Sequence, residues 1–211
     1  MDSLPNERNA PMSTEVDRGR RQLLTVATTV TGAVGIAFAA APFLASWKPS
    51  ARAKALGAPV EIDISKLESG AMLKIVWRGK PVYIVRRTPG MIESLAGIDE
   101  RLADPSSDVS RQPEYAKNAG RARNPEYFVV LGVCTHLGCA PQNRFNPGAS
   151  EDGVLNADWP GGFFCPCHGS KFDVSGRVFK GVPAPTNLEI PPYTFVDRQR
   201  LLIGVDELRS S

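Results

Sequence analysis

The sequence predicts a mainly β protein, an antiparallel β head tethered to one N-terminal transmembrane helix. Three observations predict this class. Residues 23–47 carry no charge, and several runs after residue 60 are rich in β-branched and aromatic residues. The 18 prolines and 19 glycines favour a loop-rich body with short strands. A formal net charge of +3 is too small to indicate nucleic-acid binding.

The N-terminal part predicts a membrane anchor. Residues 23–47 are 25 residues long, and a helix of that length spans about 37 Å, enough for a hydrocarbon core of about 30 Å. Residues 1–22 are the predicted cytoplasmic tail, and Arg20-Arg21 resembles a twin-arginine export signal. A cleaved signal peptide is the alternative, because "ARA" at 51–53 resembles a cleavage site. The apolar run is longer than the ~7–15 residues of such signals, which favours a retained anchor.

The chain after the anchor predicts a linker and then the head. Residues 48–60 are small and polar, which indicates a flexible hinge before a head at 61–211, and a frayed helix end with no mechanical role is the alternative. "AMLKIVWRGKPVYIVRRT" predicts a hairpin that turns at Arg78-Gly79-Lys80. "GMIESLAGIDERLAD" predicts a helix between Met91 and Ala103. Further short strands are expected in "EYFVVLGV", "GGFFCPC", "GRVFKG", "LEIPPYTFVD" and "RLLIGVD".

Two polar, proline-punctuated stretches are expected to lie on the surface of the head. They are residues 104–126 and an insertion at 141–162, between the second and third cysteines. Neither stretch carries a pattern that indicates chemistry.

All four cysteines and both histidines lie in two short segments, "CTHLGC" at 134–139 and "CPCHGS" at 165–170. A structural zinc site is one interpretation, but it leaves two cysteines over. Disulfides without metal are a second, which gives the histidines no reason to be there. The third is a 2Fe–2S centre with two thiolate and two imidazole ligands. It accounts for all six residues if the two other cysteines bridge the segments.

These two segments resemble the cluster-binding loops of Rieske iron–sulfur proteins, in the form found in quinol–cytochrome c oxidoreductases. "WRGKPVYIVRRT", "GVPAPTNLEIPPY" and the N-terminal span extend the resemblance over nearly the whole chain from about residue 20. It implies a Rieske-type head with one Rieske 2Fe–2S cluster, in a cluster-binding subdomain at about 130–186. The implied roles are thiolate ligands at Cys134 and Cys165, imidazole ligands at His136 and His168, and a disulfide between Cys139 and Cys167.

The resemblance also implies a function. Such a subunit accepts an electron and a proton from ubiquinol, with His168 and His136 at the reacting end, and passes the electron to a c-type cytochrome. This contributes to proton translocation. Expected partners are the cytochrome b and cytochrome c subunits of a dimeric complex and a soluble c-type cytochrome. The expected location is the bacterial inner membrane, with a single span and the C-terminal head in the periplasm, where a disulfide persists.

Three further residues are expected to act around the cluster. Ser170 matches the family serine that donates a hydrogen bond to a cluster sulfur. Phe172 stands where many high-potential members have tyrosine, so a lower potential is expected. Leu137 either shields the cluster or touches a partner, and an ordinary core leucine is the alternative. Residues 181–185 resemble the proline loop that covers the cluster.

Other classes remain as alternatives. The small subunit of another periplasmic Rieske enzyme, such as an arsenite oxidase, can share the disulfide and the export signal. Soluble Rieske ferredoxins and ring-hydroxylating oxygenases usually lack the second cysteine in each loop. A structural zinc module predicts a colourless protein.

Overall fold

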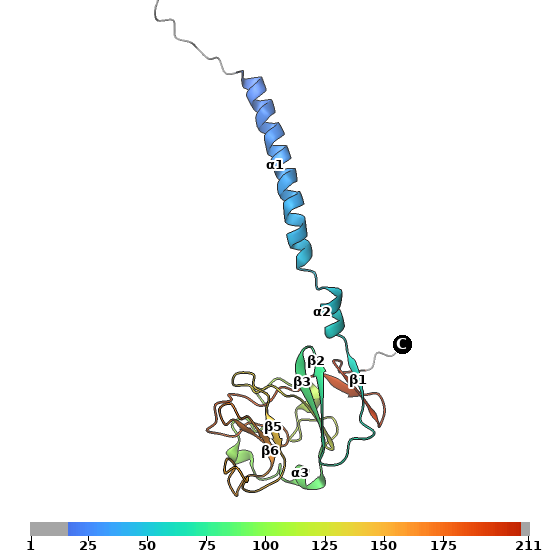
Figure 1. Ribbon diagram of the computed structural model, residues 1–211, viewed down its shortest axis with the longest axis vertical. Coiled ribbons are helices and arrows are strands. Elements are labelled where there is room, and N and C mark those ends of the chain that lie inside the picture. Colours follow the sequence, from blue (N-terminus) through green and yellow to red (C-terminus); the bar gives the residue numbers. More distant parts are fainter. Residues whose placement is uncertain (1–16, 208–211) are drawn as a thin grey trace, which may run out of the picture. The chain divides into compact units, whose positions relative to one another are not determined.

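A long N-terminal helix and a β-rich head make up the computed structural model, which describes residues 17–207 (Figure 1). The chain divides into two units after Ser50. The first unit holds helix α1, Arg18–Ser46, and the second begins with the short helix α2, Ala51–Leu56. The predicted hinge at 48–60 therefore includes one helical turn and a half, and its flexibility stays a prediction.

Helix α1 combines a polar start with an apolar body. The carboxylate of Asp17 accepts hydrogen bonds from the backbone N–H groups of Gly19 and Arg20 and so caps the helix. Pro42 lies inside the helix without ending it. Within residues 17–207, this is the one helix region long and apolar enough to cross a membrane, and none of the helix residues is buried. Most of residues 1–22 lies outside the described residues.

The described part of the head is built from three antiparallel sheets of three strands each. Their orders are β1-β9-β8, β2-β3-β4 and β5-β6-β7. The strand bounds are Val60–Asp63 (β1), Met72–Trp77 (β2), Lys80–Arg86 (β3), Tyr127–Leu131 (β4), Gln142–Arg144 (β5), Gly162–Phe164 (β6), Lys171–Phe172 (β7), Tyr193–Phe195 (β8) and Arg200–Ile203 (β9). The predicted mainly β class is confirmed.

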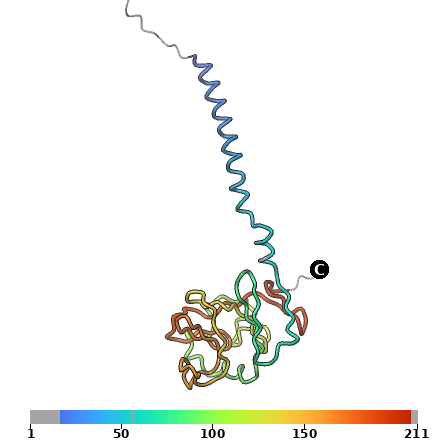
Figure 2. Tube along the Cα trace, viewed as in Figure 1, coloured from blue at the N-terminus to red at the C-terminus, as the bar shows by residue number. Residues whose placement is uncertain are grey.

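The first described strand of the head pairs with the last one. Strand β1, the first of the head, pairs along its whole length with β9, the last, so segments far apart in sequence lie side by side (Figure 2). The predicted hairpin is confirmed as β2–β3, with Trp77 paired to Lys80. Arg78 and Gly79 form its turn with φ of 51° and 73°, as a two-residue turn of this hand requires.

The main core lies between the first two sheets and the cysteine-bearing segments. It contains apolar side chains of β3 and β4 together with Cys134, Cys165, Phe163 and Phe172. A smaller cluster under the 141–162 stretch includes Leu155 and Trp159. The metal-capable segments are thus fixed to the core rather than carried on free loops.

Two expectations for the head are wrong in part. The predicted helix at 91–103 is instead α3, Pro89–Glu93, followed by a 3-10 turn η1, Asp99–Arg101. Gly97, with φ of 77°, breaks the periodic run between them. The "GRVFKG" segment makes isolated bridges, Phe172 to Val178 and Leu102 to Phe179, rather than a strand.

The two predicted surface stretches are also more buried than expected. The 104–126 stretch carries a second 3-10 turn, η2 at Glu114–Ala116, and Ala116 is buried. Its polar residues Asp104, Ser107 and Arg121 are buried as well. The 141–162 stretch supplies β5 and the buried Leu155 and Trp159. Both stretches pack against the interior of the head. The polar composition of a stretch does not by itself predict this burial.

Candidate metal centre

The two cysteine-bearing segments follow two strand ends, as predicted. The first cluster loop, residues 134–139, comes after β4, and the second cluster loop, residues 165–170, comes directly after β6. Buried strands hold the first cysteine of each loop close to the core, and Cys134 and Cys165 are each 2% exposed. Both are free thiols.

The two loops have the same backbone turn. The N–H of Cys134 donates to the carbonyl of Cys139 at 2.8 Å, and the N–H of Cys165 donates to the carbonyl of Ser170 at 2.8 Å. Each turn is closed by a glycine four residues after the first cysteine, with φ of 83° at Gly138 and 78° at Gly169. Their N–H groups donate back to the Cys134 and Cys165 carbonyls at 2.9 and 3.0 Å.

The free thiols face each other at the base of the loops. Burial raises the pKa of the Cys134 thiol, the hydrogen-bonded Cys165 thiol raises it further, and the His136 N–H and the Ser170 hydroxyl oppose this. Metal binding requires the thiolate, so a cation bound here would displace the proton and supply the positive charge that a buried thiolate needs.

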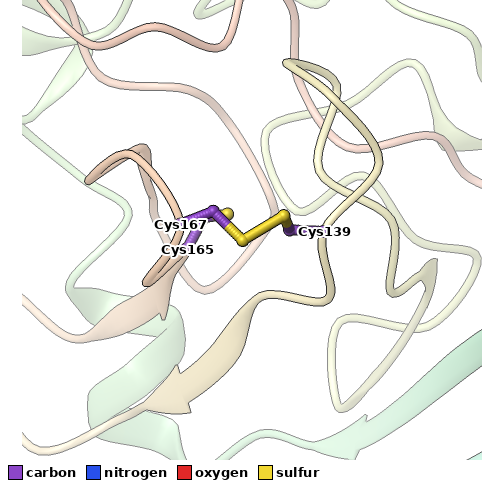
Figure 3. A group of neighbouring side chains, drawn as sticks. All are labelled: Cys139, Cys165 and Cys167. Carbon is purple, nitrogen blue, oxygen red and sulfur yellow. A yellow bond between two sulfur atoms is a disulfide. The ribbon is translucent and has the colours of Figure 1, made fainter.

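The two other cysteines form a disulfide. Cys139 and Cys167 are bonded, with Cα atoms 6.6 Å apart, and this cross-link joins the two cluster loops (Figure 3). The sulfur of Cys165 lies within 4.8 Å of both. Since two of these three sulfurs are bonded to each other, the group offers one free thiol and is not a three-thiolate site.

The two imidazoles lie beside each other. The ring centroids of His136 and His168 are 4.9 Å apart and the ring planes are at 87°. His168 is exposed and His136 is half-buried. The structure therefore brings together two free thiols and two imidazoles from two loops, and the sequence-based site residues are neighbours in space.

The residues present fit the implied cofactor in their chemistry. Two thiols and two imidazoles are the ligand set of a Rieske centre. The same set would also suit zinc. The donor atoms alone leave both metals open.

A third segment, residues 181–187, ties both cluster loops together. The hydroxyl of Thr135 donates to the carbonyl of Thr186 at 2.6 Å. The N–H of Ala184 donates to the hydroxyl of Ser170 at 3.0 Å. Ser170 is 1% exposed. Because its oxygen accepts this bond, its own O–H is left to donate toward the sulfur of Cys134. The expected proline loop thus acts as a clamp with named contacts.

The other two predicted residues differ in exposure. Leu137 is 71% exposed at the tip of the first cluster loop, which excludes the ordinary core leucine. Phe172 is fully buried in the same core as both thiols.

Sequence analysis missed Tyr83 and the clamp residue Thr135. The hydroxyl of Tyr83 donates to the carbonyl of Pro141 at 3.1 Å, just after the first cluster loop. Its ring passes so close to Gly132 that a Cβ there would lie 2.3 Å from it. The signal was the glycine two residues before Cys134, which ends a strand where a large ring needs room.

The region that holds the two cluster loops matches a known family. Residues 106–193 match the family described as "Rieske [2Fe-2S] domain". Residues 11–50 match the family described as "Ubiquitinol-cytochrome C reductase Fe-S subunit TAT signal".

Curated relatives extend the similarity to nearly the whole chain. The ubiquinol-cytochrome c reductase iron-sulfur subunit of Allochromatium vinosum is 54% identical over 197 residues, 93% of this chain and 94% of that protein. The subunit of the same name from Blastochloris viridis is 45% identical over 186 residues, 88% and 92% of the two chains. That of Bradyrhizobium diazoefficiens is 42% identical, again over 186 residues, covering 88% and 94%.

Proposed function

The chain belongs to the family of Rieske iron–sulfur subunits of ubiquinol–cytochrome c reductase, and on this premise we propose that it is the electron-transfer subunit of that enzyme. It carries one Rieske 2Fe–2S cluster in its head and is anchored in a membrane by α1. It works with cytochrome b and cytochrome c subunits of the complex. The names of the relatives favour this enzyme over an arsenite oxidase.

The cluster ligands in this proposal are Cys134 and Cys165 on one iron and His136 and His168 on the other. The observation that carries it is the meeting of two buried free thiols and two adjacent imidazoles, while the remaining cysteines are bonded to each other. When bound, the cluster supplies a one-electron acceptor whose potential is raised by imidazole ligation. The clamp contacts of Ser170 and Thr135 hold the two loops in register.

The proposed contact with ubiquinol is His168. Its imidazole is exposed, so its outer ring nitrogen is free to accept a hydrogen bond from the quinol hydroxyl and then its proton. His136, half-buried beside it, is the second imidazole available for a proton. The exposed Leu137 at the neighbouring tip provides an apolar contact for the quinol pocket of a partner subunit.

The finer location and partners follow from the same proposal. We place the head in the periplasm and the helix in the bacterial inner membrane, as a single span with residues 1–22 in the cytoplasm. The match of residues 11–50 to a twin-arginine signal family supports this, as does a disulfide that an oxidising compartment preserves. We also propose that a soluble c-type cytochrome accepts the electron downstream and that the complex is a dimer.

The proposal includes motion of the head on residues 48–60. Helix α2 occupies residues 51–56 of this linker. Two prolines at Lys54 and Ala55 would remove two backbone donors from α2 and stiffen the chain. We expect slower quinol-dependent reduction of cytochrome c with an unchanged cluster spectrum. Unchanged turnover would contradict the hinge.

The decisive experiment is purification of the chain with its complex from membranes. We expect co-purification with haem-containing subunits, ubiquinol–cytochrome c reductase activity, and the paramagnetic resonance signal of a reduced diiron centre with mixed Cys and His ligation. A colourless protein that contains only zinc would overturn the cluster assignment. Co-purification with arsenite-oxidising activity would overturn the enzyme assignment while leaving the cluster in place.

A further inference from the structure

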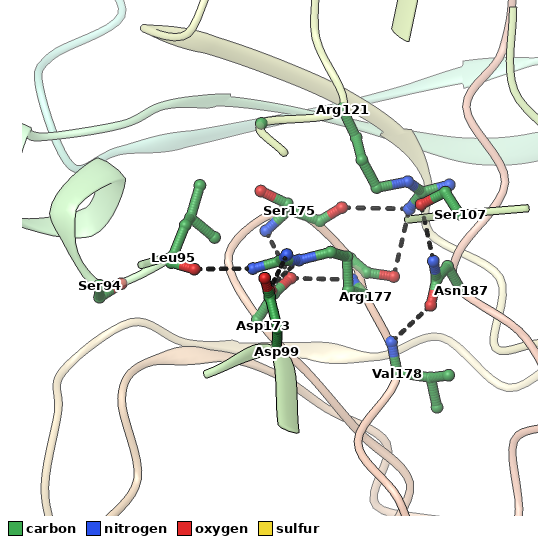
Figure 4. A network of polar contacts seen from close by, with 12 residues as sticks. Ser94, Leu95, Asp99, Ser107, Arg121, Asp173, Ser175, Arg177, Val178 and Asn187 are labelled. Atoms are coloured by element: carbon green, nitrogen blue, oxygen red, sulfur yellow. Dashed lines mark hydrogen bonds and ion pairs between the residues drawn. The ribbon is translucent and has the colours of Figure 1, made fainter. Parts of the chain in front are cut away.

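Three arginine side chains are buried together behind the second cluster loop. Arg87, Arg121 and Arg177 are 1%, 0% and 1% exposed. All three bond to the turn at residues 173–177, which follows β7 and therefore the second cluster loop. Figure 4 shows Arg121 and Arg177 at this turn. A buried guanidinium is costly to desolvate, so three at one turn call for an explanation.

Only one of the three has a carboxylate partner in the described contacts. Arg177 bonds to the buried Asp173 at 2.7 Å and to Asp99, whose side chain reaches in from the surface, at 2.9 Å. Arg177 and Asp173 form a buried ion pair, in which the carboxylate compensates the charge of the guanidinium.

Arg121 bonds to neutral oxygens alone. It donates to the carbonyls of Ser175, Gly176 and Leu188 at 3.1, 3.3 and 2.7 Å and to the amide oxygen of Gln112 at 2.9 Å.

Arg87 is in the same situation. It donates to the carbonyls of Pro125 and Gly120 and to the hydroxyl of Ser175, at 2.8, 2.9 and 3.0 Å. Its second terminal nitrogen, Nη2, has no hydrogen-bond partner. The hydrogen bonds of Arg87 and Arg121 spread their charge over neutral groups and do not cancel it.

The carboxylates near this interior make no described hydrogen bond to Arg87 or Arg121. Three carboxylates accompany the three arginines: the buried Asp104 and Asp173, and Asp99, which bonds to Arg177 from the surface. Asp104 bonds to Ser110 and Asn187 rather than to an arginine. Burial lowers the pKa of both Arg87 and Arg121 to about 10, which still leaves each protonated at neutral pH.

The charges lie close to the cluster loops along the chain. Asp173 follows Ser170 by three residues, so their Cα atoms are at most about 11 Å apart. Ser175, which both Arg87 and Arg121 contact, is two residues further. The intervening Phe172 and Phe163 are fully buried and paired, so apolar groups rather than water fill this region.

We infer that the buried guanidinium groups of Arg87 and Arg121 raise the reduction potential of the centre held by the two cluster loops. The inference rests on the proposed function, because it needs the cluster at that site. A reduced centre carries one more negative charge, so a guanidinium without a directly bonded carboxylate, in a poorly screened interior, favours the reduced state. One unit charge at about 15 Å and an effective dielectric constant of about 20 changes the ratio of reduced to oxidised centre by about sixfold.

The sharpest test is Gln112→Glu. This nearly isosteric change places a carboxylate on the Arg121 Nε that already bonds to Gln112, and it loses the bond that the Gln112 amide donates to the Ser107 carbonyl at 3.2 Å. Gln112→Met is the matched control, since it loses that bond as well and adds no charge. Both variants are studied in the purified complex, by redox titration of the cluster's circular dichroism and by thermal unfolding.

The expected result is a severalfold lower reduced fraction at a fixed applied potential for Gln112→Glu and a much smaller change for Gln112→Met. Arg121→Lys and Arg121→Gln repeat the comparison at the arginine, with the potential retained for lysine and lowered for glutamine. If Arg121→Gln does not fold, the comparison of Gln112→Glu with Gln112→Met still tests the inference.

Equal potentials for Gln112→Glu, Gln112→Met and the original protein, with the cluster signal intact, would overturn this inference alone. Absence of the cluster signal in the original protein would instead overturn the proposed function. The two failures are therefore distinct.

Discussion

The two cluster loops share one backbone turn but place different side chains on it. In each, the first residue is a buried free cysteine and the fifth a glycine in the left-handed region. At the third position the first loop has His136 and the second has Cys167. At the fourth, Leu137 corresponds to His168.

The sixth position shows the most useful difference. The first loop ends in Cys139, which is cross-linked to Cys167, and the second ends in Ser170, which the clamp segment binds through Ala184. One turn geometry therefore places a buried thiol, a proposed metal ligand, at its base. Its outer positions carry a proposed imidazole ligand in each loop together with a cross-link, a hydrogen-bond donor or an apolar tip. The comparison predicts equal effects at shared positions and unequal effects elsewhere.

The largest effect is expected at the shared first position. Cys134→Ser and Cys165→Ser each remove a buried thiol that we propose as a cluster ligand, so both should abolish the cluster completely. Iron content and the visible spectrum of the purified protein measure this. A variant of either cysteine that keeps a full complement of iron would break the proposed equivalence of the two loops.

The next effect concerns the cross-link that occupies different positions in the two loops. Cys139→Ser opens a loop of 28 residues. The chain-entropy model gives a loss of about 3.5 kcal/mol of folding free energy. Denaturant unfolding followed by fluorescence measures it, and Cys167→Ser is the matched variant. Loss of the cluster in either variant without any loss of stability would assign that cysteine to the metal instead.

The shared glycines should give a smaller and equal effect. Gly138→Ala and Gly169→Ala meet no atom within 4 Å of the new Cβ, so the cost is the left-handed backbone alone, about 1–2 kcal/mol. Gly90→Ala in α3 is the control, because its backbone is not left-handed and its nearest neighbour is 3.9 Å away. Thermal unfolding compares the three. A cost at one loop glycine only would show that the turns are not equivalent.

The smallest effect is expected at Ser170, the sixth position of the second loop, and at Phe172, two residues beyond it. Ser170→Ala removes a hydroxyl that acts on the Cys134 side, so the potential should fall. Phe172→Tyr adds a donor beside the same core, so it should rise. Each change is worth about one hydrogen bond, about 1 kcal/mol. Redox titration separates the two, and shifts in the same direction would refute the hydrogen-bond explanation.

The sequence predicted the residues of the candidate site better than the residues that hold the two cluster loops in place. Six residues of two types in two short segments have few ways to bind metal, and the disulfide of Cys139 and Cys167 is confirmed. The hairpin at Arg78-Gly79 is confirmed because a two-residue turn has strong local requirements. The hairpin depends on neighbours in sequence, whereas the disulfide, between residues 28 positions apart, was implied by the family resemblance.

The supports depend on contacts between distant segments, which no local pattern encodes. Arg121 lies in a polar stretch expected at the surface, yet it is buried because carbonyls of Ser175 and Leu188 surround it. Strand β1 exists because β9, 139 positions further at Glu61 and Arg200, supplies its partner and an ion pair. Tyr83 was missed for the same reason.

The pairing of β1 with β9 has a mechanical consequence. Any tension that reaches the head along the tether first meets Ala58, whose carbonyl accepts a hydrogen bond from the Trp77 indole at 3.1 Å. It then meets the ladder between β1 and β9, which begins at Val60. The last described strand therefore bears the pull on the first strand of the head, and the cluster loops, which follow strands of the two other sheets, are shielded from the strain.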